Sequence, residues 1–308
     1  MRSTIFQRLR VACAAGLLLC GLGAGAVAQE AAGVAPLRGT LFRLRSTGTI
    51  IIGYRESSLP FSFLDGSRQP VGYAIDLCRA VAEQAAAELG IAPLTISWRP
   101  VTPETRIGAV ANGEVDLECG STTSNAERQR QVAFSPIFFI AGTKLLVRRA
   151  SNVQAPRDLA GRTVVVTAGT TNEAAIRRLS ERQRLNLTIV TRPDHAQSFA
   201  LLAEGGAEAF ATDDVLLYGL IAETPRGSEL YRVTGEYLSY DPYGLMFRRD
   251  DPDFAAVVRR SFTRLAAERR LSEIYTRWFM HRLPHGQRLN IPMSPHLEEV
   301  FRMLGEPE

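Results

Sequence analysis

Residues 119–135, CGSTTSNAERQRQVAFS, bring together groups that could bind an anion. Four hydroxyl side chains occupy positions 121–124, directly after a short apolar run. Ser124 and Glu127 have the spacing of a capping box, which predicts a helix that begins after Ser124. Arg128 would then lie in the first helical turn, beside free backbone N–H groups at the positive end of the helix dipole. A cation, hydroxyls and free amides at one place indicate a site for an anion that is not part of the chain.

The elements that must position these groups follow an alternating pattern. Short apolar runs predict strands at 49–54, 94–99, 115–119, 143–148, 163–167, 187–191, 208–212 and 243–248. Helical periodicity predicts helices at 72–89, 103–112, 125–131, 171–184, 195–204, 213–222, 252–269 and 271–280. Because strands alternate with helices, the sequence predicts an α/β fold with mainly parallel sheets.

Ligands of open α/β sheets bind outside the carboxyl ends of strands, at the N-termini of helices. Arg55, Arg106 and Arg128 follow strands in the N-terminal half, and Asp213 ends a strand in the other half. Arginine can donate two parallel hydrogen bonds to a carboxylate, so this set suits a small dianion that also carries a cation. Polar residues follow other predicted strands as well: Ser121 and Thr123 follow 115–119, Thr170 follows 163–167, and His195 follows 187–191.

Several of these residues also have structural explanations. An arginine at a helix start is often a solvated surface charge, and Asp214 fits a helix N-cap. Thr170 and Glu173 form a second capping box, which gives Glu173 a role without chemistry. A functional interpretation is favoured because all the polar groups fall at the same edge of the predicted sheets.

The N-terminal residues predict export. Three arginines precede an apolar run at 11–27, and Ala26-Val27-Ala28 fits the cleavage rule of secretory signal peptides. A membrane anchor is the alternative, and Cys20 raises lipidation, but Leu19 is bulky for a lipobox. We therefore expect residues 1–28 to be a cleaved signal peptide and the mature protein to be periplasmic.

The composition of the mature chain excludes several classes. Residues 1–28 hold three of the 36 basic residues and none of the 32 acidic ones, so the net charge falls to +1. We expect no nucleic-acid partner, because no basic patch is evident. No Cys/His cluster has metal-ligand spacing, and we expect no cofactor. Cys78 and Cys119 remain, and two buried reduced thiols are the favoured interpretation over a disulfide.

The remaining chain is long enough for about two domains. Strands 143–148 and 243–248 each end in a double arginine with no helix directly after, and we interpret them as crossing strands between two lobes. The first lobe would comprise 36–143 and 244–280, and the second 144–243. Residues 281–308 include Pro284, Gly286, Pro292 and Pro295 and predict a tail on the first lobe, with a short helix near 295–304.

At these residues the sequence resembles the periplasmic amino-acid-binding proteins of ABC transporters, family 3, and within them the binders of glutamate and aspartate. The resemblance runs from about Leu41 to Asn290, and its most specific segments are those at 117–135 and 164–173. The segments that carry it are GYRESSLPFSFLD (53–65), LECGSTTSNAERQRQVAFS (117–135), VVVTAGTTNE (164–173), DHAQSF (194–199) and DDVLL (213–217).

The resemblance implies a two-lobe, type II periplasmic-binding-protein fold that closes by a hinge on one amino acid, as a monomer that delivers its ligand to ABC permease subunits. It implies Arg128, with Thr123 and Thr170, at the ligand α-carboxylate, and Asp213, with Ser121, at the ammonium. It places the side-chain carboxylate against the group Arg55, Arg106, Thr167 and His195.

Two positions depart from the resembled proteins. Pro103 stands where they have a serine, so one hydroxyl contact to the ligand is expected to be missing. Leu245 stands where they have a cysteine, so Cys119 lacks that partner here.

Two other functions remain open from the sequence. Cyclohexadienyl dehydratases have the same architecture and a catalytic glutamate in a Thr-Asn-Glu context, which Thr171-Asn172-Glu173 matches. Asp213 argues against such an enzyme, because prephenate has no ammonium. A sensory role, with delivery to a receptor instead of a permease, is the third possibility.

Overall fold

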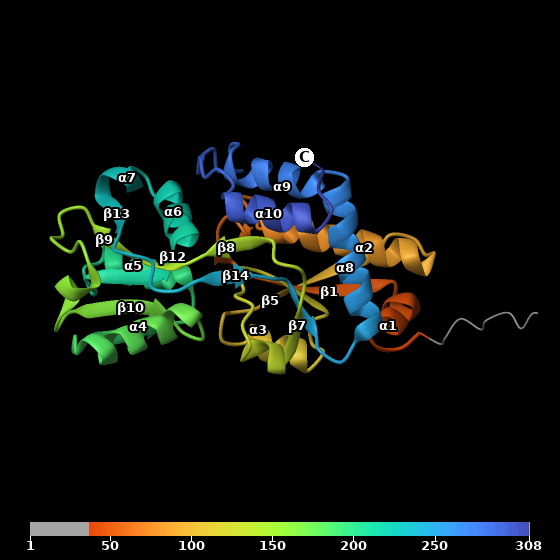
Figure 1. The fold of residues 1–308 in the computed structure, drawn as a ribbon, viewed down its shortest axis with the longest axis horizontal. Helices are drawn as coiled ribbons and strands as arrows, with labels where there is room; N and C mark the ends of the chain where they lie inside the picture. The colour runs from red at the N-terminus through yellow and green to blue at the C-terminus, as the bar shows by residue number, and fades with distance from the viewer. Residues whose placement is uncertain (1–36, 308) are drawn as a thin grey trace, which may run out of the picture. The chain divides into compact units, whose positions relative to one another are not determined.

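The computed structural model describes residues 37–307 (Figure 1). The predicted signal peptide, residues 1–28, lies outside the described residues. Two five-stranded sheets organise the described chain, and in each of them four strands run in one direction and the fourth strand of the order runs opposite to its two neighbours. We call the parts built on these sheets the first lobe and the second lobe. The predicted α/β fold class is confirmed.

The first sheet has the order β5-β1-β6-β15-β7. Its strands are β1 (Thr49–Tyr54), β5 (Thr95–Pro100), β6 (Leu117–Cys119), β7 (Val132–Phe134) and β15 (Met246–Arg248). The helices of this lobe are α1 (Gly39–Thr47), α2 (Tyr73–Leu89), α3 (Arg106–Ala111), α8 (Pro252–Ala267), α9 (Arg270–Phe279) and α10 (Pro295–Met303). A small sheet of β2 (Ser57–Ser58), β3 (Ser62–Leu64) and β4 (Pro70–Val71) follows β1.

Helix periodicity explains how the first lobe packs. The apolar side chains of α2 recur every three to four residues, as at Ile75, Cys78 and Val81, so one stripe of the helix is buried. α2, α8 and α9 join the main core of the lobe, whereas α3 packs in a smaller cluster with Val132 and Met246. The C-terminal α10 inserts Leu297 and Phe301 into the main core.

The second sheet has the order β11-β10-β12-β9-β13. Its strands are β9 (Thr143–Arg148), β10 (Thr163–Thr167), β11 (Thr188–Arg192), β12 (Ala209–Asp213) and β13 (Tyr231–Thr234). The helices of this lobe are α4 (Thr171–Gln183), α5 (His195–Ala203), α6 (Asp214–Glu223), α7 (Gly227–Leu230) and the 3₁₀ turn η2 (Pro156–Leu159). Successive residues of β10 enter opposite cores, Val164 and Val166 on one face and Val165 on the other, because side chains alternate along a strand.

The two lobes share a strand topology that the sequence did not reveal as a repeat. In each, the first parallel strand lies between the second and the third, at β1 and at β10. The crossovers therefore diverge on either side of that strand, which opens a crevice at its carboxyl end. This arrangement brings the predicted polar strand ends to one edge of each sheet.

The strands that run between the two sheets are β8 (Phe139–Ala141) and β14 (Asp241–Tyr243), which pair with each other (Figure 1). The predicted crossing strands 143–148 and 243–248 are therefore displaced. The first, β9, lies wholly in the second sheet, and the second continues into β15 of the first sheet. The double arginines mark the C-terminal ends of β9 and β15, away from the crossing segments. Sequence periodicity alone could not separate these strands from the crossing segments that precede them.

The prediction of two reduced cysteines is wrong. Cys78 of α2 and Cys119 at the end of β6 form a disulfide, with their Cα atoms 6.2 Å apart. Both residues are fully buried. Cys78 lies on the apolar face of α2, as predicted, and this face packs its sulfur against Cys119 at the end of β6. The disulfide therefore depends on tertiary packing, which the sequence pattern does not show.

Three predicted helix starts are also corrected. No helix begins at Ser124: its hydroxyl accepts from Gln129 Nε2 at 2.9 Å, and a three-residue 3₁₀ turn, η1 (Arg128–Arg130), follows instead. Helix α3 begins at Arg106 and not at 103, because Thr102 and Thr105 bond each other in a turn. Asp214 is the first residue of α6 and not its N-cap, and its carboxylate accepts from the Tyr237 hydroxyl.

Within the described residues, no helix has the length and apolar character that crossing a membrane requires.

Candidate functional site

Two buried arginines lie together in the first lobe. Arg55 follows β1 and Arg106 is the first residue of α3, and their exposed fractions are 1% and 2%. Arg106 donates to the hydroxyl of Thr122 at 2.6 Å and to the Ser121 carbonyl at 3.2 Å. Arg55 Nη1 and Arg106 Nε have no hydrogen-bond partner among the described residues. Burial, and then the charge of Arg106, lowers the pKa of Arg55 to about 9.

Glu118 lies beside this arginine pair, and the sequence did not single it out. It is fully buried in the middle of β6, and its Oε2 accepts from the Thr122 hydroxyl at 2.8 Å. A Cβ at Gly120 would lie 2.5 Å from Glu118 Oε1 and 2.9 Å from Arg55 Cγ, so only glycine allows the two side chains to meet there. One glutamate opposes two arginines, and this leaves an excess positive charge in the site.

His195 approaches the arginine pair from the second lobe. It is the first residue of α5, and its Nδ1 lies 2.9 Å from the Thr167 hydroxyl, which also contacts Ser198. Burial, followed by the charges of Arg55 and Arg106, lowers the pKa of His195 well below 6.5. The ring is therefore neutral at pH 7.

Arg128 forms a second cationic position. It is 6% exposed, and its Nη1 donates to the Thr123 carbonyl at 2.9 Å. Its backbone N–H is capped by Asn125 Oδ1 at 2.9 Å, which replaces the predicted cap by Ser124. Burial, and then the charge of Arg106, lowers the pKa of Arg128 to about 10, so it stays cationic. The guanidinium of Arg128 therefore offers a permanent positive charge to the anionic ligand that the sequence predicts.

Asp213 ends β12 and faces a polar cluster. Its Oδ1 accepts from Asn172 at 2.7 Å, and its Oδ2 accepts from the Tyr243 hydroxyl. Burial is the main cause that raises the pKa of Asp213 to about 7, and the neighbouring Asp241 carboxylate raises it further. A cation placed here would favour the ionised carboxylate.

The cluster around Asp213 contains residues that sequence reasoning missed. Asn172 donates from the first turn of α4, and Tyr243 and Asp241 come from the crossing strand β14. The hydroxyl of Thr123 donates to Asp241 Oδ1 at 3.0 Å. Asn172 had been considered only as part of a catalytic motif, and Asp241 fell just outside the predicted strand 243–248.

The lobes touch across this site. Arg128 Nη2 of the first lobe donates to the Gly169 carbonyl of the second at 3.2 Å, and the hydroxyls of Thr123 and Thr171 are 3.2 Å apart. Thr170 is half-buried beside them, and its hydroxyl caps α4 at Glu173 and donates to the Thr167 carbonyl. The predicted site residues thus form two groups, one around Arg55 and His195 and one around Arg128 and Asp213.

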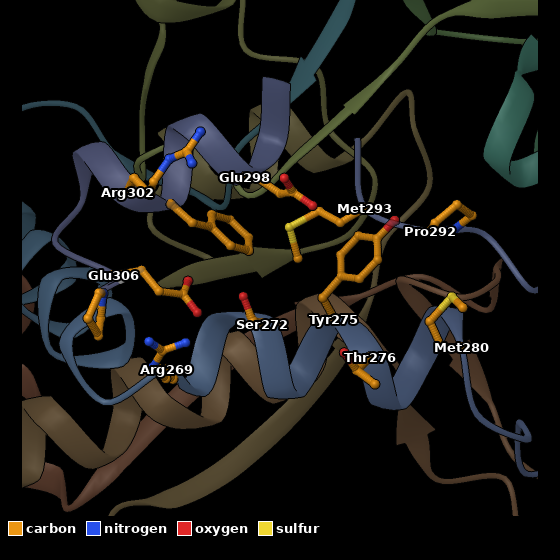
Figure 2. Close-up of a pocket in the computed structure, with 12 residues that line it drawn as sticks. Arg269, Ser272, Tyr275, Thr276, Met280, Pro292, Met293, Glu298, Arg302 and Glu306 are labelled. Atoms are coloured by element: carbon orange, nitrogen blue, oxygen red, sulfur yellow. The ribbon is translucent and has the colours of Figure 1, made fainter. Parts of the chain in front are cut away.

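A pocket of about 520 Å³ opens beside the arginine pair. Its walls come from both lobes: Arg55, Glu56, Ser57, Pro100, Val101, Thr102, Thr105, Asp194 and Ala196. Another pocket, of about 440 Å³, lies in the first lobe between α9 and α10, where Tyr275 and Met293 face each other (Figure 2). No predicted site residue lines that second pocket, so it is not the candidate site.

The described residues contain no group of three or more His, Cys, Asp or Glu side chains that could hold a metal ion. Glu173, the candidate acid of the dehydratase alternative, pairs with Arg177 at 2.8 Å and accepts from the Gly169 N–H at 3.2 Å. In the predicted capping box this carboxylate would accept from the backbone N–H of Thr170. In the structure it accepts from the N–H of the preceding residue, Gly169. These contacts give Glu173 a structural role.

Two lobes joined by two strands, with buried cationic and anionic side chains where they meet, define a two-lobe solute receptor. Residues 50–281 match the family of bacterial extracellular solute-binding proteins, family 3. The chain belongs to this family.

Two curated relatives match nearly the whole chain. The L-glutamate/L-aspartate-binding protein of Pseudomonas aeruginosa is 40% identical over 93% of this chain and 92% of its own length. The glutamate/aspartate import solute-binding protein of Escherichia coli K12 is 35% identical over 94% and 95%. Because these relatives are solute-binding proteins, the comparison favours binding over the dehydratase alternative.

Solved structures support the fold. An ancestral arginine-binding protein bound to arginine superposes with a TM-score of 0.68 at 25% identity and covers 75% of this chain and 98% of its own. A mutant of ArgBP from T. maritima superposes with a TM-score of 0.70 at 23% identity over 78% and 99%. The type II periplasmic-binding-protein fold is thereby confirmed.

Proposed function

We propose that this protein captures L-glutamate and/or L-aspartate in the periplasm for an ABC transporter, by closure of its two lobes on one ligand. The observation that carries the proposal is the buried pair of Arg55 and Arg106, each with an N–H that has no acceptor among the described residues. Buried cationic donors need an anionic acceptor, and a ligand carboxylate supplies two oxygens.

The remaining groups fit the other end of an acidic amino acid. Arg128, with Thr123 and Thr170, would bind the α-carboxylate, and Asp213, with Ser121, would bind the ammonium. Thr167 orients His195, whose neutral ring can donate one hydrogen bond to the side-chain carboxylate. The names of the relatives from Pseudomonas and Escherichia agree with this ligand class.

The two lobes would move as rigid bodies about β8 and β14, and the ligand would stabilise their closed arrangement. One lobe would comprise 36–143 and 244–280, and the other 144–243. Export through a cleaved signal peptide is supported by the Cys78–Cys119 disulfide, because disulfides persist in oxidising compartments. The partners would be the membrane subunits of an ABC permease, reached by a monomer that binds no nucleic acid.

The ligand class is tested by comparing glutamate, aspartate, glutamine and asparagine. We expect the acidic ligands to bind more tightly than their amides by about 2–4 kcal/mol, because an amide leaves a buried arginine charge unpaired. A thermal-shift screen is sensitive enough, since ligand at 100 times its Kd stabilises by ~2.7 kcal/mol. Calorimetry then gives the ratio of affinities. Equal affinities for glutamate and glutamine would refute the proposal.

A matched pair of variants locates the discrimination. Arg55→Met removes one buried charge, and we expect the ratio between glutamate and glutamine to fall. Arg99→Met is the control, because Arg99 is exposed on the neighbouring β5 and pairs with Glu114. A ratio that falls equally in both variants would mean that long-range charge, and not the clamp, sets the preference.

Affinity should depend on pH through Asp213. The pKa of about 7 means that Asp213 holds a proton below neutral pH, and a ligand ammonium must displace it. Affinity is therefore expected to fall about tenfold from pH 8 to pH 6. A bound carboxylate would raise the pKa of His195 and act in the opposite sense. That pKa begins well below 6.5, so Asp213 dominates this range.

Ligand binding should release the proton held by Asp213. Calorimetry at pH 6.5 in two buffers with different ionisation enthalpies measures how many protons are released per ligand bound. Affinity that rises as pH falls from 8 to 6 would contradict the protonated Asp213 and would indicate that a cationic His195 sets the pH dependence.

Closure is tested at Gly169, which has φ +72° at the contact between the lobes. A Cβ there would lie 2.8 Å from Glu104 Cα and 3.0 Å from Glu104 N, which are backbone atoms of the other lobe. We expect Gly169→Ala to weaken binding by about 1–3 kcal/mol without removing a polar contact, because the left-handed backbone and the closed interface both resist a side chain. Small-angle scattering with saturating ligand would show less compaction than in the unchanged protein. Equal compaction and affinity would show that this contact does not limit closure.

A further inference from the structure

A second buried carboxylate stands near the proposed ammonium site. Asp241 lies on the crossing strand β14 and is 2% exposed. Its Oδ1 accepts from the Thr123 hydroxyl at 3.0 Å, and its Oδ2 accepts from the Ser239 hydroxyl. Both partners are neutral, and no ion pair within the described residues includes Asp213 or Asp241.

Hydrogen bonds connect the two carboxylates through the hinge. The Ser239 hydroxyl lies 2.7 Å from that of Thr143, and Asn172 Nδ2 donates to both the Thr143 hydroxyl and Asp213 Oδ1 at 2.7 Å. Tyr243, two residues after Asp241 on the same strand, donates to the other oxygen of Asp213. The two acids therefore belong to one network that spans Thr123 of the first lobe and Asp213 of the second.

Charge is the unusual feature of this network. An ionised carboxylate buried with neutral partners is costly unless a cation compensates it. Arg128 is the cation whose field reaches both acids, and the α-carboxylate of an amino acid would engage it. The carboxylate of Asp213 would suffice to bind one ammonium. An asparagine at position 241 could accept the same hydrogen bonds from the two hydroxyls, so these contacts do not require the charge of Asp241.

We propose that Asp241 is a positioning residue that makes the site demand an amino group. Its charge acts through the network, so that the site rejects dicarboxylates without an ammonium and holds Thr123 in place for the α-carboxylate. This inference rests on the proposed function and deepens it, since it explains how a receptor for acidic amino acids would exclude the corresponding diacids.

The test compares L-glutamate with glutarate, which is the same diacid without the amino group, by calorimetry and by displacement. In Asp241→Asn we expect glutamate to bind more weakly and glutarate to bind equally or more tightly, so that their affinity ratio falls on the order of tenfold. Asp214→Asn is the control. It removes the same charge from the residue next to Asp213, but its carboxylate faces Tyr237 outside the network, and we expect a much smaller change.

Carboxyl NMR gives a second readout. Because the Asp241 charge raises the pKa of Asp213, that pKa should fall in Asp241→Asn. In the unchanged protein, glutamate should shift the titration of Asp213 to lower pH, and glutarate should not. These measurements decide the matter if glutarate binds too weakly to measure or if the variant does not fold.

The outcomes separate the two proposals. Equal weakening of glutamate and glutarate, or an Asp213 pKa that the variant leaves unchanged, would reduce Asp241 to a structural residue and overturn this inference alone. Failure of the unchanged protein to bind either acidic amino acid would overturn the proposed function. The Asp213 titration would still test the coupling of the two carboxylates in that case.

Discussion

Arg128→Ala is expected to abolish the binding of every amino acid, at a cost of about 3–5 kcal/mol, as when one partner of a buried ion pair is removed. Arg128 is buried, donates to Thr123 and Gly169 in different lobes, and would meet the α-carboxylate that all amino acids share. Calorimetry with glutamate, aspartate and their amides measures the loss.

The control for this variant lies in the same 3₁₀ turn. Arg130 is exposed, so Arg130→Ala removes an equal charge without touching the site, and its affinity should stay within about twofold, as for surface substitutions. Arg128→Lys keeps the charge but loses the planar fork, and it should recover only part of the binding. Micromolar binding by Arg128→Ala, with an unchanged melting temperature, would overturn the assignment.

Removal of the disulfide is expected to give the second large effect, on stability instead of binding. The bridge between Cys78 and Cys119 closes a loop with a sequence separation of 41. The chain-entropy model assigns such a loop about 4 kcal/mol, through restriction of the unfolded chain. In Cys78→Ala/Cys119→Ala the melting temperature should fall by roughly 10 °C, at ~2–4 °C per kcal/mol for a chain of this size.

Urea unfolding with and without reductant separates the bridge from the packing of two small side chains. Reductant should destabilise the unchanged protein nearly to the level of the double variant and should leave the variant unaffected. If reductant leaves the unchanged protein as stable as before, the two thiols are not bridged, and the sequence-based expectation of reduced cysteines would stand.

Periodicity is a local property, and it located most of the regular structure. Helix 72–89 is α2 at 73–89, and strands 49–54, 143–148 and 163–167 match β1, β9 and β10 to the residue. The short strands β2, β3, β4, β7, β8, β13 and β14 were missed. Each has only two to four residues, which is too few for a period of two to emerge.

The sequence could place the candidate polar residues near one another because of where they stand in the chain. Arg55, Arg106, Thr167, His195 and Asp213 each lie at the end of a strand or the start of a helix, and an α/β topology brings such points to one edge. All five are buried where the lobes meet. The residues that were missed, Glu118 and Asp241 among them, become neighbours of the site only through packing and the path of the crossing strand.

The sequence by itself determined the α/β class, the family resemblance and the charged groups at the strand ends, because these depend on residue type and local spacing. Only the tertiary structure decided the Cys78–Cys119 disulfide, the pairing of the crossing strands β8 and β14, and the pKa shifts of Asp213 and His195. The physical reason is distance through space. Sulfur pairing, strand partnership and the pKa of a buried group depend on atoms that lie tens to hundreds of residues away along the chain.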